Sequence, residues 1–429
     1  MSSKPITTAT YEEATPALVP RLRFPEFREA EGWKSVPLNR LATRAKQKNR
    51  DESIDRVLTN SAEFGVVDQR DFFDKDIATQ GKLEGYVVVE LGSYVYNPRI
   101  SSTAPVGPLS KNKIGTGVMS PLYTAFKFKD DRNDFYEYFF KTTGWHNYMR
   151  QASSTGARHD RMAISSDGFM AMPLHVPSPD EQKIIAECLS SVDELMAAQA
   201  QKVDALKTHK KGLMQQLFPR EGESQPRLRF PEFQNAGEWE VKTLGELVAV
   251  ASGQVDPTQS PYCDLPQIGG ENIESDSGKL VNVKSAGDKG VISGNYAFDE
   301  NDVLYSKIRP ALNKVAAPAF KGICSADIYP IRPANGGLLR SYLLYSLLSP
   351  RFLEYAIGNS ERGKIPKINR DCLLTYEVLI PPPFEQQHIA SCLTSLDALI
   401  NSETQKYEAL KTHKSALMQQ LFPSAENAK

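Results

Sequence analysis

Basic, amide and hydroxyl side chains gather in several short loops of this 429-residue sequence. Arginine and lysine bind phosphate oxygens, and arginine, asparagine and serine also reach the edges of nucleic-acid bases. The candidate positions for such contacts are Lys46, Lys48, Arg50, Asn97, Arg99, Lys111, Lys113, Arg158, Ser306, Lys307, Arg309, Lys314, Arg362, Lys364 and Lys367. Taken singly, each of these residues could equally belong to a solvated loop that binds nothing.

Some of these positions occur twice, at matching places in the two halves of the chain. Tyr96-Asn-Pro-Arg99 has a counterpart in Tyr305-Ser-Lys-Ile-Arg309, and Arg158 pairs with Arg362 at an offset of 204 residues. Both halves end in a small basic loop, at residues 153–161 and 359–370. Because the two halves otherwise differ, this pairing favours a binding role for these loops over a merely solvated surface.

Patterns that would indicate catalysis or a metal site are absent from the sequence. No Gly-x-x-x-x-Gly-Lys-Ser/Thr segment is present, so we predict no nucleotide-phosphate loop. Asn97-Pro98 is followed by arginine, unlike the Asn-Pro-Pro-aromatic motif that holds the target amine in amino-methyltransferases. Residues 179–183, PDEQK, resemble a nuclease carboxylate–lysine motif only superficially, and the six histidines lack metal-ligand spacing. We therefore predict no catalytic residue and no metal ligand.

A 39-residue segment follows each basic loop and is repeated. Glu181–Pro219 and Glu385–Pro423 align without a gap, and 24 of the 39 positions are identical. Alternating steps of four and three place apolar residues on one face, which predicts a coiled-coil helix of roughly 50–55 Å in each copy. The apolar seam comprises Ile185, Leu189, Val192, Met196, Val203, Leu206, Leu213 and Leu217, then Ile389, Leu393, Leu396, Ile400, Tyr407, Leu410, Leu417 and Leu421.

Polar residues interrupt this seam at the same two places in each copy, at Gln199 and Lys210 and at Glu403 and Lys414. One such helix cannot bury its apolar stripe alone, so we expect the two copies to pack against each other. An ordinary helical hairpin would satisfy the same periodicity. The connection of about 165 residues between the copies argues against a simple hairpin.

The front of each half is also repeated. The letters RLRFPEF occur at 21–27 and at 227–233, and a tryptophan follows six residues later, as Trp33 and Trp239. The chain is therefore a tandem of two units of about 205 residues, each with an RLRFPEF segment, a variable body and a long helix. The segment has two interpretations that the sequence leaves open, which are a local packing device and a docking surface for a partner.

The variable bodies predict a mixed α+β fold, with two globular domains in tandem and a long coiled-coil helix after each. Residues 86–90, 93–96, 303–305 and 326–332 read as strands, and residues 135–148 and 338–356 read as helices. The predicted domains are a flexible tail at 1–20, a first globular domain at 21–177, a first spacer helix at 178–219, a linker at 220–226, a second globular domain at 227–381, a second spacer helix at 382–423 and a tail at 424–429.

The totals describe an ordinary soluble composition. The net charge is −1, which by itself does not favour a nucleic-acid protein, although basic residues clustered on one face would escape that total. No run of 18 apolar residues predicts a membrane span, and the first 20 residues have no secretory signal. Five scattered cysteines without Cys-x-x-Cys spacing fit a cytoplasmic protein.

The sequence resembles the specificity (S) subunits of type I restriction-modification systems. The resemblance rests on the EQ-x-x-I-A-x-C-L-x-S-x-D segments at 181–193 and 385–397, the LMQQLFP tails, RLRFPEF, the segment VLYSKIR at 303–309 and the loop SERGKIPKIN at 360–369. It covers residues 21–423. The first half departs from the pattern, with NPRI where SKIR is more usual and a final loop without the GKIPKI form.

That resemblance implies a function without an active site in this chain. Each variable body would be a target recognition domain that reads one half of a split double-stranded DNA sequence. The resemblance also implies that the two domains stand in pseudo-twofold tandem, separated by two long antiparallel coiled-coil helices that would set the gap. Two methyltransferase (M) subunits that modify adenine N6, and restriction (R) subunits, would be the partners. S-adenosylmethionine, ATP and Mg would belong to those partners, with no cofactor in this chain and no membrane association. The alternative is a non-catalytic protein-interaction scaffold with a two-helix coiled coil.

Overall fold

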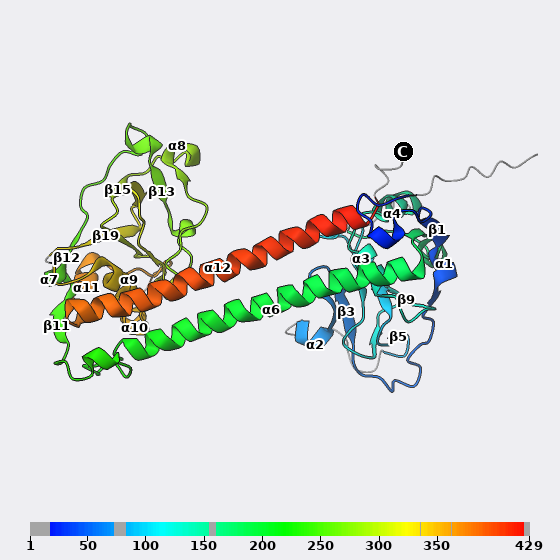
Figure 1. Ribbon diagram of the computed structural model, residues 1–429, viewed down its shortest axis with the longest axis horizontal. Helices are drawn as coiled ribbons and strands as arrows, with labels where there is room; N and C mark the ends of the chain where they lie inside the picture. Colours follow the sequence, from blue (N-terminus) through cyan, green and yellow to red (C-terminus); the bar gives the residue numbers. More distant parts are fainter. Residues whose placement is uncertain (1–17, 73–82, 154–159, 335, 362, 424–429) are drawn as a thin grey trace, which may run out of the picture. The chain divides into compact units, whose positions relative to one another are not determined.

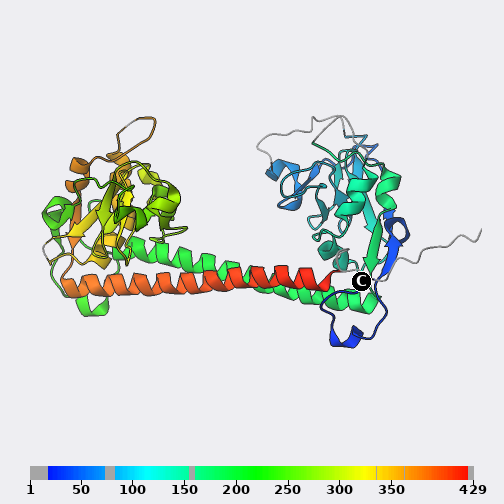
Figure 2. The same cartoon turned by 90° about the horizontal axis from the view of Figure 1, so that it is seen from above.

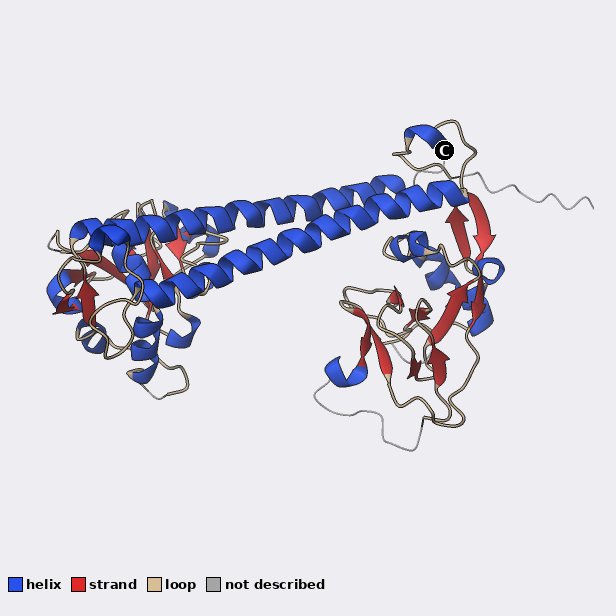
Figure 3. Ribbon diagram, turned by 60° about the horizontal axis from the view of Figure 1, so that its bottom comes forward, coloured by secondary structure: helices blue, strands red, loops and turns tan. Residues whose placement is uncertain are grey.

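The protein divides into two compact units, each containing part of both long helices. Unit 1 comprises Met1–Ala197 with Glu408–Lys429, and unit 2 comprises Ala198–Tyr407. The computed structural model describes residues 18–72, 83–153, 160–334, 336–361 and 363–423 (Figure 1). Arg158, Arg362 and most of the two predicted tails lie outside these residues. Both units mix helices with sheets, so the predicted α+β class is confirmed (Figure 3).

Unit 1 is built around a four-stranded sheet in the order β2-β9-β6-β7, flanked by three strand pairs. Its strands are β1 Lys34–Pro37, β2 Ala42–Arg44, β3 Leu58–Ser61, β4 Gly65–Asp68, β5 Val87–Val89, β6 Tyr94–Tyr96, β7 Leu109–Lys111, β8 Gly117–Met119, β9 Thr124–Phe128 and β10 Pro173–Val176. Its helices are η1 Pro25–Phe27, α1 Leu38–Leu41, α2 Gln69–Phe72, α3 Asp134–Phe139, α4 His146–Ala152 and α5 Ser166–Met170. Strand β6 is buried along its whole length, which its aromatic and β-branched residues favour.

Unit 2 contains two four-stranded sheets, in the orders β12-β19-β16-β17 and β14-β13-β18-β15, and the pair β11-β20. Its strands are β11 Glu240–Thr243, β12 Val248–Val250, β13 Pro266–Ile268, β14 Lys284–Ser285, β15 Asn295–Phe298, β16 Val303–Ser306, β17 Val315–Ala316, β18 Gly322–Ser325, β19 Ile328–Pro333 and β20 Glu377–Ile380. Its helices are η2 Pro231–Phe233, α7 Leu244–Leu247, η3 Tyr262–Asp264, η4 Gly270–Asn272, α8 Ala286–Lys289, η5 Pro310–Leu312, α9 Arg340–Leu348, α10 Pro350–Gly358 and α11 Arg370–Leu374.

The four strands predicted from the sequence are confirmed as β5, β6, β16 and β19. The two helices predicted within the bodies are each wrong in one respect, because each is two helices. Residues 135–148 contain the end of a helix at Phe139 and the start of another at His146. Residues 338–356 are divided at Ser349, since Pro350 opens a new helix and its missing N–H cannot continue the preceding one.

A common frame surrounds these different bodies. In unit 1, β1 pairs antiparallel with β10, and in unit 2 β11 pairs antiparallel with β20. A tryptophan is buried just before each first strand, as Trp33 and Trp239. The repeated front and back of each sequence half therefore form one small sheet that closes the body in both units.

The two long helices are α6 Pro179–Leu217 and α12 Pro383–Leu421, each roughly 58 Å long at the usual rise per residue (Figure 2). Their segments run antiparallel within each unit. In unit 1, Lys414 on α12 pairs with Asp193 on α6. In unit 2, Gln199 faces Glu403 while Lys210 faces Asp397, so the residue numbers of the two helices run in opposite directions. All twenty seam positions are buried or half-buried.

Unit 1 also brings together segments from the two ends of the sequence. The Leu22 amide donates to the Gln420 carbonyl near the end of α12, at 3.0 Å. The equivalent bond in unit 2 runs from Leu228 to Gln216 at 2.9 Å, where a short linker joins the two segments directly. Within the described residues, no helix is long and apolar enough to cross a membrane.

Candidate nucleic-acid interface

In unit 2, the two basic loops found in the sequence are joined into one antiparallel ribbon. The chain leaving β16 forms one side, and residues 366–368 form the other. The Arg309 amide donates to the Pro366 carbonyl at 2.7 Å, and the Ile368 amide donates to the Lys307 carbonyl at 2.9 Å. We call residues 306–309 with 366–368 the second ribbon.

Unit 1 contains the same arrangement, the first ribbon, made of residues 97–100 and 160–162. The Ile100 amide donates to the Asp160 carbonyl at 3.0 Å, and the Met162 amide donates to the Pro98 carbonyl at 2.9 Å. These bonds align Met162 with Ile368, an offset of 206 residues rather than the 204 that aligns the helices. The equivalence of the two ribbons is thus clear from backbone bonding although their sequences differ.

Arg309, at the end of the second ribbon, has a strained backbone that neighbouring contacts support. Arg309 has φ 49° and Asn313 has φ 45°, left-handed values that are unfavourable for residues other than glycine. Asn313 Nδ2 donates to Asp276 Oδ1 and to the Leu348 carbonyl, which holds this turn against the body. The Arg309 residue is nevertheless exposed. A strained, well-supported backbone that presents an exposed arginine is typical of a functional site.

The structure separates the candidate residues by exposure. Those exposed to solvent are Lys46, Lys48, Arg50, Arg99, Lys113, Arg309, Lys364 and Lys367. Those half-buried are Asn97, Lys111, Lys307 and Lys314. The exposed residues can contact a large partner, whereas the half-buried residues also contact their own chain.

Three candidates have partners within the chain. Ser306 is only 3% exposed, and its Oγ donates to the Ile308 carbonyl, so it stabilises the ribbon from inside. Lys314 Nζ donates to the Gly270 carbonyl at 2.5 Å. Lys111 Nζ lies 2.8 Å from Asp134 Oδ1 and above the Tyr94 ring. These side chains are held by their own chain, which sequence spacing could not reveal.

Asn97 is an orienting residue rather than a free reader of bases. Its Nδ2 donates to the Asn60 carbonyl at 3.0 Å, and its Oδ1 accepts from the Arg99 amide at 3.1 Å. Both ends of the amide are thereby used to fix the turn that carries Arg99. The neighbouring Arg99 residue remains exposed.

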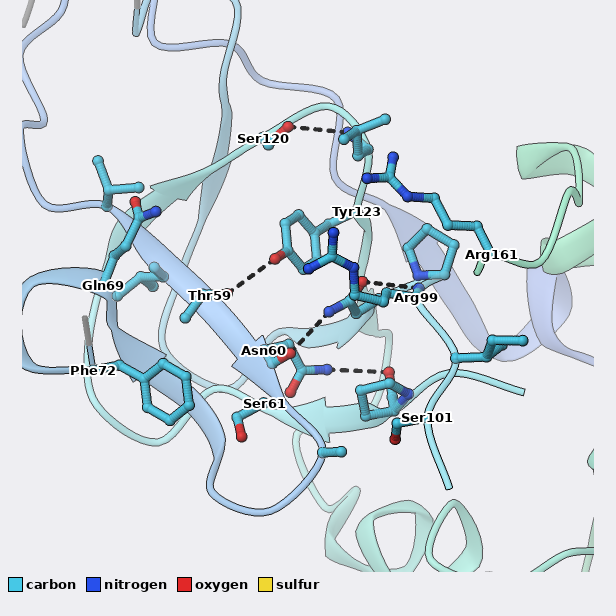
Figure 4. A pocket seen from close by; sticks show the side chains of 18 of the residues that line it. Thr59, Asn60, Ser61, Gln69, Phe72, Arg99, Ser101, Ser120, Tyr123 and Arg161 are labelled. Atoms are coloured by element: carbon cyan, nitrogen blue, oxygen red, sulfur yellow. Dashed lines mark hydrogen bonds between the residues drawn. The ribbon is translucent and has the colours of Figure 1, made fainter. Parts of the chain in front are cut away.

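Arg161 belongs to the first ribbon and was missed by the sequence analysis. It is the bridge partner of Arg99, and both line a cavity of about 470 Å³ (Figure 4). The Thr59 hydroxyl and the Tyr123 phenol, 2.9 Å apart, line the same cavity. The available signal was the basic loop at 153–161, from which Arg158 was chosen instead. Arginines on both sides of one bridge favour an anion beside them, and Arg161 Nε already lies 3.6 Å from Asp160 Oδ2.

Arg370 is a second cation that the sequence analysis missed, next to the second ribbon. Its guanidinium lies 5.8 Å from the centre of the Tyr329 ring, and Lys307 Nζ lies 5.3 Å from the same centre. Burial raises the pKa of Tyr329, so the phenol stays neutral at physiological pH. A neutral aromatic ring that both cations approach orients both of them. The Arg370 side chain also donates to the Ala251 carbonyl.

The basic stretch at residues 46–50 is built into a different part of unit 1. Lys48 forms a bridge with Val87 of β5, and the Gln47 carbonyl accepts from the Val88 amide. Lys46, Lys48 and Arg50 are exposed, whereas Asn49 between them is buried and bonded to Ile54. The stretch is thus tied to the edge of β5 rather than to the first ribbon.

In the part of the chain that the structure describes, no three His, Cys, Asp or Glu side chains gather as metal ligands would. The side chains of the two ribbons instead offer positive charges and hydrogen-bond donors. Their arrangement can hold phosphates and base edges, and each unit supplies one such surface.

A family model matches part of the chain, most of it in the second unit. Residues 236–412 match the family model described as the Type I restriction modification DNA specificity domain. The EcoDI type I restriction enzyme specificity subunit of Escherichia coli is 29% identical over 246 residues, covering 52% of this chain and 54% of that protein. The match therefore spans about half the length of that relative. The MjaVIII specificity subunit of Methanocaldococcus jannaschii is 24% identical over 332 residues, covering 73% of this chain and 74% of that protein.

Solved structures share the fold over most of the chain. One, from a study titled as the structural basis of complex assembly and conformational transition of the type I R-M system, has a TM-score of 0.56 at 16% identity and covers 91% of this chain and 98% of its own. The type I S subunit from M. genitalium has a TM-score of 0.55 at 12% identity and covers 95% of this chain and 100% of its own. The resemblance suggested by the sequence motifs is confirmed by the family match and these relatives.

Proposed function

We propose that this chain is the DNA specificity subunit of a type I restriction-modification complex, the family to which its residues 236–412 belong. The observation that carries the proposal is the basic ribbon, which has the same backbone bonds in both units. The two units share the strand order of one four-stranded sheet, β2-β9-β6-β7 and β12-β19-β16-β17, but differ in their remaining strands, and both retain this surface. A bipartite DNA target, with one half read by each unit, accounts for both the repetition of the ribbon and the difference between the bodies.

The exposed cations in and beside the ribbons have two tasks. Arginine can donate two hydrogen bonds to the O6 and N7 atoms of guanine, which suits Arg99 and Arg309 at the ribbon turns. Lysine binds phosphates without selecting a sequence, which suits Lys364 and Lys367. A subunit that shares DNA wrapping with its partners does not need a large positive charge of its own, consistent with a net charge of −1.

The partners in this proposal are two M subunits and further R subunits. The exposed residues Lys207, Thr208 and His209 of α6 recur as Lys411, Thr412 and His413 of α12. Identical exposed residues in the two units support the docking of two copies of one partner. S-adenosylmethionine, ATP and Mg would be bound by those partners, and this chain would act in the cytoplasm, where chromosomal DNA is accessible, without catalysing a reaction itself. The alternative of a protein-interaction scaffold is not favoured, because the matched family is a DNA specificity domain.

The test is a map of methylated adenines in a genome that carries this chain with its methyltransferase. We expect a bipartite motif, of which one half becomes degenerate when Arg309→Ala is introduced. Lys321→Ala, at an exposed lysine before β18, should leave the motif unchanged. Methylation that does not depend on this chain would contradict the proposal.

A further inference from the structure

Three apolar side chains on segments that adjoin the second ribbon are exposed. Leu312 is 40% exposed, Ile357 is 46% exposed and Ile365 is 48% exposed. Leu312 ends η5, which packs against α10, and Ile357 lies in the last turn of α10. Ile365 lies in the loop that follows α10 and returns to the ribbon. Of the three, Ile365 is the nearest to the ribbon along the chain, one residue before Pro366.

The chain that follows Ile365 is tied to the second ribbon. The next residue, Pro366, accepts a bond from the Arg309 amide, and Ile368 is buried beneath the ribbon. The Glu361 amide donates to the Lys367 carbonyl at 2.8 Å, and Lys367 Nζ lies 3.2 Å from Glu361 Oε2. The chain just beyond Ile365 is thus fixed by four contacts while the Ile365 side chain remains in water.

The immediate neighbours of Ile365 define what it can meet. Lys364 precedes it and Lys367 follows two positions later, and both are exposed. Cations on both sides favour a polyanion at this point, and an isoleucine cannot bond to a phosphate. Among the groups that DNA presents in the major groove, the C5 methyl of thymine is the apolar one.

We propose that Ile365 contacts the C5 methyl group of a thymine in the half-site read by unit 2, and so determines specificity for an A·T pair. This inference rests on the proposed function in DNA recognition. In this proposal the loop recognises a base through an apolar contact, and Lys364 and Lys367 bind the phosphates. Covering one methyl group changes affinity by roughly fourfold.

The experiment uses the complete complex of this chain with its methyltransferase and duplexes of the mapped target. Thymines of the half-site that Arg309→Ala loosens are replaced by uracil one at a time, which removes only the methyl group. For the unaltered chain, we expect one replacement to weaken binding by roughly fourfold. In Ile365→Ala this replacement should have no effect, whereas Ile292→Ala, at a residue 83% exposed elsewhere in unit 2, should retain it.

The outcomes separate this inference from the function on which it rests. Sequence-specific binding without a uracil effect that depends on residue 365 would overturn the inference and leave the function standing. A half-site without thymine on either strand would also overturn it. Weaker assembly of Ile365→Ala with the methyltransferase, at unchanged uracil discrimination, would assign the side chain to a protein contact instead. A complex with no sequence preference at all would overturn the proposed function itself.

Discussion

Gln199 Nε2 donates a hydrogen bond of 2.7 Å to Glu403 Oε2, although the two residues hold the same position in the two copies of the repeat. Glu403 is 3% exposed, and Lys202 and Lys406 lie 3.1 and 2.8 Å from its carboxylate oxygens. Two glutamates at this place would repel each other, whereas an amide and a carboxylate attract. A polar pair of this kind within an apolar seam specifies which helix segments pair and in which register.

The ionisation of Glu403 should make the stability of unit 2 depend on pH. The amide of Gln199, followed by Lys406 and Lys202, lowers the pKa of Glu403 from 4.5 to about 2. As the pH falls, the carboxyl of residue 403 is protonated in the unfolded chain before it is protonated in the folded chain. The stabilisation is therefore complete above pH 4.5 and is lost as the pH falls towards 2. We expect Glu403→Gln to destabilise the protein at pH 6 and to do so much less near pH 3, measured by urea unfolding. An equal difference at both pH values would contradict this account.

Removing the arginine inside an RLRFPEF segment should destabilise its unit. Arg23 forms a two-point bond with Glu181 at the start of α6, at 2.8 and 2.7 Å, and both side chains are buried. Arg229 and Glu385 form the equivalent pair in unit 2. Because Arg23→Met leaves a buried carboxylate without its partner, we expect a loss of about 3–5 kcal/mol in the free energy of unfolding.

The control for this substitution is Arg28→Met, at an exposed arginine just after the same segment. It should change the free energy of unfolding by less than about 0.5 kcal/mol. Similar losses in the two variants, measured by denaturant unfolding, would show that the contacts of Arg23 do not hold this segment against its unit. The contacts of Arg23 and Arg229 support the packing interpretation of RLRFPEF, which the sequence had left open beside a docking role.

The length of the helices should set the gap in the recognised sequence. Both α6 and α12 begin in one unit and end in the other. Deleting one heptad from each removes about 10.5 Å of helix, which corresponds to about three base pairs of DNA. We expect the gap in the methylated motif to shorten by that amount, and insertion of a heptad in each helix to lengthen it equally. A gap that stays constant in both variants would refute the role of the helices as a spacer.

Arg309 and Lys364 should differ in how their loss affects DNA binding. Arg309→Ala should weaken binding to the mapped target by about 1–3 kcal/mol and relax selection at one base pair. Lys364→Ala should weaken binding to all sequences alike and reduce the slope of affinity against salt concentration by about 1. The measurement is a salt titration of binding to the target and to single-base variants. Identical behaviour of the two substitutions would contradict the assignment of Arg309 to a base edge.

Local patterns in the sequence predicted the frame of this protein well. The heptad spacing predicted α6 and α12 because apolar residues at that interval lie on one face of a helix, and the second copy of the repeat supplies the partner for that face. Short apolar runs predicted β6 and β16. The same method joined α9 to α10, because it weighed the apolar stripe and ignored the proline at position 350.

What the sequence by itself determined is the tandem of two units, the pair of long helices and the family resemblance, since repeats and periodicity are written in neighbouring residues. Only the tertiary structure decided that residues 366–368 bond to the chain leaving β16, that Arg161 meets Arg99, and that Ser306 faces inward. These contacts join segments some 60 residues apart through backbone groups that every residue has. No side-chain pattern specifies such bonds, so the binding surface emerges only once the sheets and helices have placed the loops side by side.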